Sequence, residues 1–221
     1  MATTLAFGCS HAPYTHPDAV DFLADLRRQF KPDHVYHLGD EIDAHRWSRH
    51  EPEADAMGAA DELTAARKQL RPLYKLFPDV KVCTSNHGSR HLAAANRAGL
   101  PSDWLRSVAD VLCAPRGWRW ADYWIDDDGV RYEHGDRYSG QNGHVKAAMT
   151  NRCSTVIAHI HSYAGVAWRS NGSGPDIFAV NAGCLVDPQS FGMRYAKRYS
   201  AAPTLGACVI LEGTPVWVPL I

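Results

Sequence analysis

The first half of the chain alternates short apolar runs with longer amphipathic segments. The apolar runs at residues 3–8, 34–38 and 80–84 are predicted strands, and each ends at a cluster of polar residues. The segments between them, at residues 17–30 and 52–77, are predicted helices. The first has apolar residues at helical spacing, and the second is rich in alanine, leucine and charged residues. This alternation favours a parallel sheet covered by helices.

The second half is predicted to contain more antiparallel pairing. Residues 119–125 and 130–134 flank the turn sequence Asp-Asp-Asp-Gly and are predicted to form a β-hairpin. A helix over residues 142–152 precedes a further apolar strand at 155–158. The remaining predicted strands are antiparallel and lie at residues 163–168, 177–180, 208–211 and 216–218. No repeat or linker divides the chain, so we expect residues 1–221 to form a single α/β domain.

The composition is that of a folded protein without a strong charge of either sign. Hydrophobic residues make up 45% of the 221 residues, and 23 Lys and Arg nearly balance 24 Asp and Glu. This balance does not indicate a general nucleic-acid binder, although a local basic groove stays open. No stretch approaches the ~20 apolar residues that cross a bilayer, so we expect no membrane partner. The sequence indicates no oligomeric state.

Cysteine and histidine usage adds two expectations. The 6 cysteines form no C-x-x-C pair, and the first residues lack the basic and apolar segments of a secretion signal. Both features favour reduced thiols and a cytoplasmic location. The 12 histidines are the unusual feature, because a neutral imidazole near pH 7 is both a transition-metal ligand and a proton carrier. Their positions therefore carry the argument about function.

Side chains that can bind metal follow five of the predicted strands. In chain order they are Cys9 and His11, Asp40, Asn86 and His87, His134, and His159 and His161. Sites in parallel α/β sheets gather at the carboxyl ends of strands, so we expect these side chains to converge. A single histidine at a strand end is more often structural, so it is the occurrence of all these residues together that indicates a metal site. His159 and His161 would share one face of an extended segment.

This order of residues resembles that of the calcineurin-like metallophosphoesterase superfamily. The pattern of that family is D-x-H, G-D, G-N-H, H and G-H-x-H. The segments that stand here are Cys9-Ser10-His11, Gly39-Asp40, Ser85-Asn86-His87, His134, and Ala158-His159-Ile160-His161. The resemblance extends over most of the chain. It implies an α/β fold in which a two-sheet β-sandwich of mixed strands is flanked by helices. It also implies a short member of the superfamily, of the phage type, that lacks a capping domain.

The resemblance also implies roles for these residues. Asp40 would bridge two divalent or trivalent ions of zinc, manganese or iron. The other ligands would be His11 and His161, with Cys9 as a further candidate, for the first ion, and Asn86, His134 and His159 for the second. His87 corresponds to the catalytic histidine of the family, and Arg90 is a candidate phosphate contact. The implied activity is phosphatase or phosphodiesterase hydrolysis, in which a metal-bridging hydroxide attacks phosphorus.

Cys9 is the main departure from the family pattern, because it stands in the place of the first aspartate. A thiolate is softer than a carboxylate, so a ligating Cys9 favours zinc or iron over magnesium. The alternative is a small buried cysteine that leaves the first site with one anionic ligand fewer. Asp43 and Asp136 are candidates to orient ligand histidines, or else they are capping or surface carboxylates.

The sequence disfavours one other function and leaves two others open. A cysteine phosphatase needs C-x5-R, and Thr15 stands where the arginine would be. A metal-dependent nuclease acting on DNA or RNA uses the same core, so the substrate could be a nucleotide or nucleic acid. Residues 116–120 combine arginine and tryptophan, which suits either base stacking or a half-buried strand. A catalytically impaired binding protein that retains the fold is the non-enzymatic alternative.

Overall fold

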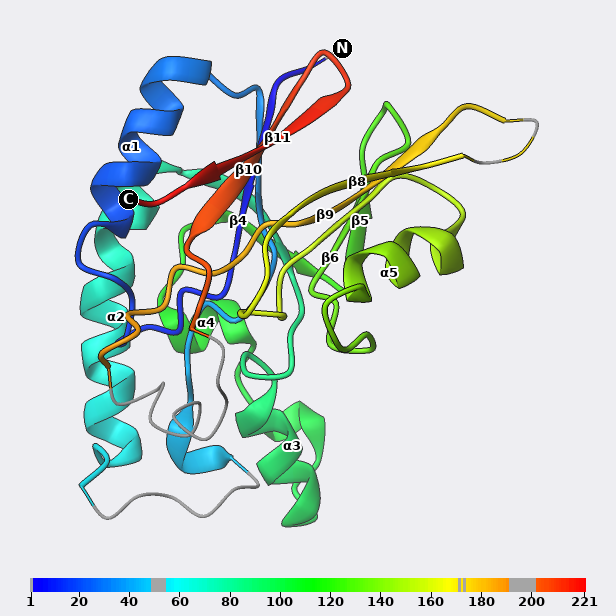
Figure 1. Ribbon diagram of the computed structural model, residues 1–221. Helices are drawn as coiled ribbons and strands as arrows, with labels where there is room; N and C mark the ends of the chain where they lie inside the picture. The colour runs from blue at the N-terminus through cyan, green and yellow to red at the C-terminus, as the bar shows by residue number, and fades with distance from the viewer. Residues whose placement is uncertain (1, 49–54, 171, 173, 191–201) are drawn as a thin grey trace.

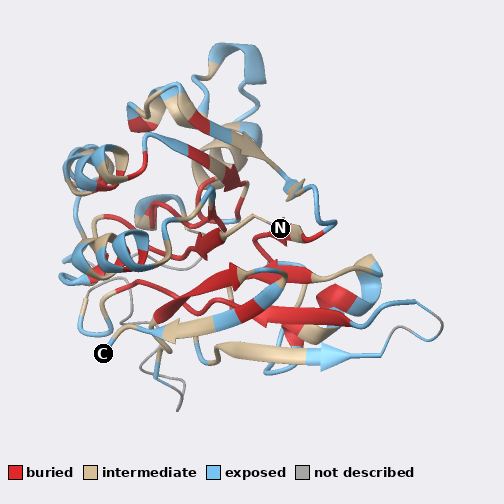
Figure 2. Cartoon of the chain, turned by 90° about the horizontal axis from the view of Figure 1, so that it is seen from above, coloured by how far each residue is buried: buried red, intermediate tan, exposed pale blue. Residues whose placement is uncertain are grey.

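Two mixed β-sheets lie face to face at the centre of the computed structural model, and helices cover their outer faces (Figure 1). The structure describes residues 2–48, 55–170, 172, 174–190 and 202–221. Viewed from above, the buried residues concentrate on the strands and on the helix faces that cover them (Figure 2). The predicted α/β fold with two sheets and flanking helices is confirmed. No described helix is long and apolar enough to cross a membrane.

The first sheet has the strand order β11-β10-β1-β2-β3-β4. Its parallel strands are β1 (Thr4–Phe7), β2 (His34–His37), β3 (Asp79–Cys83) and β4 (Gly117–Ala121). The antiparallel strands β10 (Gly206–Leu211) and β11 (Thr214–Pro219) extend it beyond β1. The carboxyl ends of β1, β2 and β3 therefore meet at one edge of the sheet.

The second sheet has the order β5-β6-β7-β9-β8. Its central strands β6 (Arg131–Glu133), β7 (Thr155–Ile157) and β9 (Ile177–Asn181) are parallel. The outer strands β5 (Tyr123–Ile125) and β8 (Gly165–Arg169) are antiparallel to their neighbours. The two sheets are joined across their interface by the rings of Tyr36 and Tyr132, which stack with centroids 3.7 Å apart.

The helices divide between the two outer faces. The helices α1 (Ala19–Phe30), α2 (Ala59–Leu76) and α4 (Val108–Leu112) cover the first sheet, and α5 (Gly143–Asn151) packs on β7 and β9 of the second. Shorter elements follow two strand ends of the first sheet, namely α3 (Arg90–Arg97) and the 3₁₀ turns η1 (His45–Trp47) and η2 (Ser102–Trp104).

Alternation along the strands builds two cores. Leu5 and Phe7 of β1 pack against the helices, whereas Ala6 between them faces the second sheet. The stretch rich in arginine and tryptophan forms β4, in which Trp118 is buried and its indole nitrogen donates to the carbonyl oxygen of Phe77. Its burial in the core agrees with the half-buried strand interpretation rather than with a base-stacking surface.

Three predicted elements differ from those observed. The predicted hairpin is divided between the sheets: β4 pairs with β3, and only β5 pairs with β6. The strand over residues 177–180 is parallel to β7, not antiparallel to all its neighbours. The helix predicted over residues 52–77 begins at Ala59, and residues 52–54 of that prediction lie outside the described residues. The first two differences depend on pairing between distant segments, which local pattern does not determine.

Candidate metal centre

Five strand ends from both sheets bring the candidate ligands together. Cys9 and His11 follow β1, Asp40 follows β2, and Asn86 follows β3. The second sheet contributes His134 directly after β6, and His159 and His161 after β7. Apart from Asn86, their donor atoms form two clusters that share Asp40, and within each cluster the donors lie within 4.8 Å of one another. The convergence expected from the strand ends is therefore observed.

The loops that carry these residues are held in uncommon backbone conformations. Cys9, His11, Asp40 and His159 all have φ between 48° and 63°, a region that costs a non-glycine residue roughly 1–2 kcal/mol. Backbone hydrogen bonds join the first two loops, with the amides of Cys9 and His11 donating to the carbonyl oxygens of Gly39 and Asp40, both at 2.9 Å. Such conformations persist where the surrounding structure enforces them, and they concentrate at functional sites.

The first cluster contains Cys9, His11, Asp40 and His161. The Nε2 atoms of His11 and His161 face each other at 3.3 Å, and Nε2 of His11 is 3.6 Å from Oδ2 of Asp40. His11 also donates from Nδ1 to the Asp43 carboxylate at 2.9 Å. A neutral ring with its proton on Nδ1 presents a lone pair at Nε2, so this hydrogen bond turns the ligand atom of His11 inward.

The second cluster contains Asp40, His134 and His159, with Asn86 beside it. Nε2 of His134 lies 3.2 Å from Oδ2 of Asp40, 3.2 Å from Nδ1 of His159 and 2.8 Å from Oδ1 of Asn86. On the opposite side of its ring, His134 donates from Nδ1 to the carbonyl oxygen of Leu38 at 2.8 Å. This contact leaves a lone pair at Nε2 that points into the cluster.

The donor atoms suit two adjacent transition-metal ions. Imidazole nitrogen, carboxylate oxygen, amide oxygen and thiolate sulfur are the ligands that zinc, iron and manganese take in proteins. Two pairs of ring nitrogens face one another at 3.2–3.3 Å. Such a contact stabilises the structure little unless a cation or a proton lies between the two nitrogens. The two sets correspond to the division of ligands that the sequence resemblance implies.

Burial and charge act against each other at Asp40. Burial opposes ionisation of this carboxylate, but the neighbouring rings of His134, His87 and His11 outweigh it and hold its pKa well below the usual range. At His134 burial opposes the charged ring, while the Asp40 carboxylate raises the pKa overall. Burial dominates at His159, lowering its pKa to about 4, and it lowers the pKa of His161 well below the usual value. Neutral imidazoles are the form that binds metal.

Cys9 lies within the first cluster and has no exposed surface. Its sulfur accepts a hydrogen bond from the backbone amide of His159 at 3.2 Å. Burial and the Asp40 carboxylate raise the pKa of the thiol well above its usual value, so deprotonation of this sulfur requires a cation nearby. The structure therefore places the Cys9 sulfur next to three other candidate donor atoms.

Asp43 organises the surroundings of the first cluster. Its carboxylate accepts from Nδ1 of His11 at 2.9 Å and lies 3.1 Å from Nδ1 of His87. These neighbours hold the pKa of Asp43 well below the usual range despite its burial. Asp43 thus orients His11, a candidate ligand, which is one of the two roles that the sequence left open for this carboxylate. Asp136, the other candidate, is exposed and acts on His134 only through its charge.

His87 and Arg90 stand beside the clusters. His87 donates from Nδ1 to the carbonyl oxygen of Asp43 at 2.9 Å, and its Nε2 accepts from the Arg90 guanidinium at 2.9 Å. The backbone amide of His87 also donates to Oδ1 of Asp40 at 3.1 Å. Arg90 donates a second hydrogen bond to the Asp43 carbonyl oxygen at 2.7 Å. Both residues therefore lie at the border of the first cluster, on the side of Asp43.

Two supporting residues were missed by sequence reasoning. Ser85 stands where the family pattern has a glycine. Its hydroxyl oxygen accepts hydrogen bonds from the backbone amides of Asp40 and Gly88 at 2.8 and 3.1 Å, and so holds the Asp40 loop in place. Glu41 is buried, and its burial raises its pKa to about 7, while Trp120 donates to its Oε1. The only sequence signal for Glu41 was its position next to Asp40, since its indole partner lies 79 residues away.

Comparison with known proteins gives a likeness of fold. No protein-family model matches the sequence, and no curated protein does. Three solved structures have a similar arrangement of elements. The phosphoesterase YfcE from E. coli is 14% identical, with 95% of this chain and 88% of that chain covered and a TM-score of 0.49. A metallophosphoesterase from Sphaerobacter thermophilus is 13% identical, with 100% of this chain and 88% of that chain covered and a TM-score of 0.49. Vps29 from Entamoeba histolytica is 10% identical, with 99% of this chain and 98% of that chain covered and a TM-score of 0.45.

Two of these three proteins are named as a phosphoesterase and a metallophosphoesterase. At these identities the likeness concerns the fold alone.

Gly39 is the residue whose substitution should disturb the Asp40 loop most directly. It has φ of 90°, and an added Cβ would lie 2.6 Å from Cβ of Ser85 and 2.9 Å from the Cys83 carbonyl oxygen. We expect Gly39→Ala to lower the free energy of unfolding by more than Gly129→Ala, which has φ of 79° but open space around it. Urea unfolding of both variants measures the difference, and equal losses would contradict this account of the loop.

Asp40 belongs to both clusters, whereas His161 belongs to the first alone. We expect Asp40→Ala to reduce bound metal at both positions and His161→Ala to reduce it at one. Metal content after dialysis, measured by mass spectrometry, gives the stoichiometry, and circular dichroism checks that each variant is folded. An Asp40→Ala protein that is folded and retains the metal content of the wild type would refute the shared role of this carboxylate.

Proposed function

We propose that this protein is a metal-dependent hydrolase of phosphoric esters. One observation carries the proposal: two clusters of metal-binding side chains share the buried carboxylate of Asp40, and a histidine–arginine pair lies at their border. Paired cations next to a proton carrier and a phosphate-binding cation suit hydrolysis of a negatively charged ester. Monoesters and diesters of phosphate are both candidate substrates.

The first ion would be held by Cys9, His11, Asp40 and His161, and the second by Asp40, Asn86, His134 and His159. When bound, a pair of such cations neutralises charge on the phosphate oxygens and makes an activated water available at neutral pH. The hydrogen bonds from His11 to Asp43 and from His134 to Leu38 orient the two rings in advance. This preorganisation lowers the cost of binding the ions and the ester.

His87 is the residue proposed to move a proton. In hydrolysis the oxygen of water bonds to phosphorus while the P–O bond to the alcohol breaks, so the alcohol oxygen takes up a proton and the water gives one up. Nδ1 of His87 is committed to the Asp43 carbonyl oxygen, which leaves Nε2 as the atom that holds or releases the proton. Protonated Nε2 cannot accept from Arg90, so the guanidinium must turn away and is then free to bind a phosphate oxygen.

The test of this function compares His87→Ala with the wild type on 4-nitrophenyl phosphate and bis(4-nitrophenyl) phosphate. Loss of a general acid lowers kcat by about 10²- to 10⁴-fold, and we expect metal content to stay at the wild-type level. His34→Ala serves as the matched control, because His34 is exposed at the start of β2. Turnover that survives complete removal of metal would overturn the proposal, and full metal content without turnover of either ester would favour a binding protein instead.

Cys9 should set the metal preference of the first position. We expect Cys9→Asp to shift occupancy from zinc or iron toward manganese or magnesium, since carboxylate is the harder ligand. With cobalt bound, the wild type should show a near-ultraviolet thiolate-to-cobalt absorption band that Cys9→Asp lacks. Cys113→Ser, at an exposed cysteine, should retain the band. A band that persists in Cys9→Asp would place Cys9 outside the ligands.

A further inference from the structure

A polar cleft of about 300 Å³ opens beside the second cluster. Its lining comes from both sheets, namely from the turn after β3, from β5 and the connection that precedes it, and from β6 and the loop that follows. Two of the lining residues, Asn86 and His134, are candidate ligands of the second ion. A phosphate bound at that ion would therefore lie at the edge of the cleft, whose volume is within the range of small-molecule sites.

The proposed proton donor belongs to the same part of the chain. Residues 85–89 form one tight turn, in which the amide of Ser89 donates to the carbonyl oxygen of Ser85 at 3.0 Å. Asn86 and Ser89 line the cleft, and His87 lies between them in the chain. The cleft, a candidate ligand of the second ion and the proposed proton donor thus meet at this turn.

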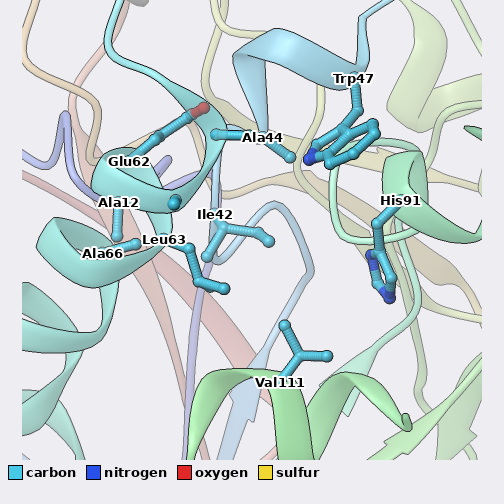
Figure 3. Close-up of a pocket in the computed structure, with 11 residues that line it drawn as sticks. Ala12, Ile42, Ala44, Trp47, Glu62, Leu63, Ala66, His91 and Val111 are labelled. Carbon is cyan, nitrogen blue, oxygen red and sulfur yellow. The ribbon is translucent and has the colours of Figure 1, made fainter. Parts of the chain in front are cut away.

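An apolar cavity of about 400 Å³ lies on the helix side of the first sheet, between α2, η1, α3 and α4 (Figure 3). Its lining includes Ile42, Trp47, Leu63, His91 and Val111. The described residues that line it include no candidate metal ligand and neither His87 nor Arg90. The polar cleft therefore adjoins the candidate ligands directly, whereas this cavity does not.

Tyr123 gives the polar cleft an aromatic surface that is held in place. The Cζ atom of Arg131 lies 3.7 Å from the centroid of the Tyr123 ring and covers one face, while the residue remains 46% exposed. Arg131 donates from Nε and Nη2 to one Glu133 oxygen at 3.0 and 2.8 Å, and Asn151 donates to the other at 2.8 Å. These contacts run from α5 to β5, so the ring is ordered before a ligand arrives. Nucleic-acid bases stack on such rings.

Hydroxyl and carboxylate groups line the rest of the cleft. Thr84 donates from its hydroxyl to Oδ1 of Asp122 at 2.7 Å, which fixes the position of this exposed carboxylate. Two further hydroxyl groups and a second carboxylate are supplied by Ser89, Tyr138 and Asp136. Carboxylates accept hydrogen bonds from hydroxyl and amino groups. The lining therefore suits an alcohol that carries several such donors.

The charges of the cleft disfavour a second anionic group on that alcohol. Arg131 is paired with Glu133 at 2.8 Å, which leaves the Arg137 guanidinium against the carboxylates of Asp122 and Asp136. All three of these side chains belong to exposed residues. A further phosphate group would meet two like charges and one opposite charge, whereas an uncharged alcohol avoids this repulsion.

We propose that the polar cleft bounded by Asn86, Tyr123 and Arg137 binds the alcohol part of the substrate, and that this part is an uncharged nucleoside. The inference rests on the proposed hydrolase function. The base stacks against the Tyr123 ring, and hydroxyl groups of the sugar donate to the carboxylates of Asp122 and Asp136. The protein then prefers nucleoside monophosphates over esters without a base and over nucleosides that carry a second phosphate.

Adenosine 5′-monophosphate and ribose 5-phosphate test the inference, because both release the same primary alcohol group of ribose and only the first carries a base. Stacking of the base is expected to raise kcat/KM about 5- to 150-fold in the metal-loaded wild type. Release of inorganic phosphate measures both rates. An equal kcat/KM for the two esters, or a value for adenosine 3′,5′-bisphosphate no lower than that for the monophosphate, would overturn the inference and leave the hydrolase proposal standing.

Tyr123→Leu removes the aromatic ring and keeps an apolar side chain on β5. Ile125→Ala is the matched control, because Ile125 is exposed two positions along the same strand and outside the cleft lining. We expect the ratio of kcat/KM for the two esters to fall toward one in Tyr123→Leu and to keep its wild-type value in Ile125→Ala and Tyr123→Phe. An unchanged ratio in Tyr123→Leu would refute the inference.

Calorimetric titration of the metal-loaded His87→Ala protein separates failure of this inference from failure of the hydrolase function, because binding requires no turnover. A dissociation constant for adenosine 5′-monophosphate about fivefold or more below that for ribose 5-phosphate, with the difference lost when Tyr123→Leu is added, would support the nucleoside site even if neither ester were hydrolysed. Equal dissociation constants, or no binding of adenosine 5′-monophosphate, would overturn the inference whatever the result of the activity assays.

Discussion

The buried carboxylate of Asp40 is the constraint on which the arrangement of the site depends. A charge removed from water is costly unless it is paired and hydrogen-bonded. Here the Nε2 atoms of His11 and His134 lie 3.6 and 3.2 Å from it, and the His87 amide donates to it. Those partners come from β1, β3 and β6, so one side chain ties both sheets together. The strained backbone at Asp40 is tolerated because several strand ends hold it.

A layer of hydrogen bonds around the histidines then decides how they can act. Asp43 and the Leu38 carbonyl oxygen each accept from an Nδ1 atom, which fixes the proton on the outer side of the His11 and His134 rings. The inner nitrogens keep their lone pairs for a cation. Cys9 on one side of Asp40 and Asn86 on the other make the two clusters chemically unequal. A soft sulfur and a hard amide oxygen select different ions.

The surroundings of the clusters are also unequal. Toward Asn86 and His134 the surface is polar and its most buried arginine is already paired, whereas beyond Asp43 and Arg90 it becomes apolar. This contrast follows from the fold, because the loop from Asp40 to Ala44 crosses from the strand end to the helices of the first sheet. Within that loop Asp40 and Asp43 face the histidines, whereas Ile42 and Ala44 pack into the helix-side core.

The sequence by itself determined the alternating strands and helices, the polar residues at strand ends and the order of the candidate ligands, because these depend on local pattern and spacing. It also placed Asp43 among the residues that could orient a histidine. Only the tertiary structure decided that β4 and β5 belong to different sheets, and that Asp43 meets His11 and His87. The sequence resemblance had assigned His159 and His161 to different ions, but the extended segment expected to carry them on one face is absent, because His159 has a left-handed backbone. The cavity beside His91 likewise depends on how helices distant in sequence pack, which no local pattern records.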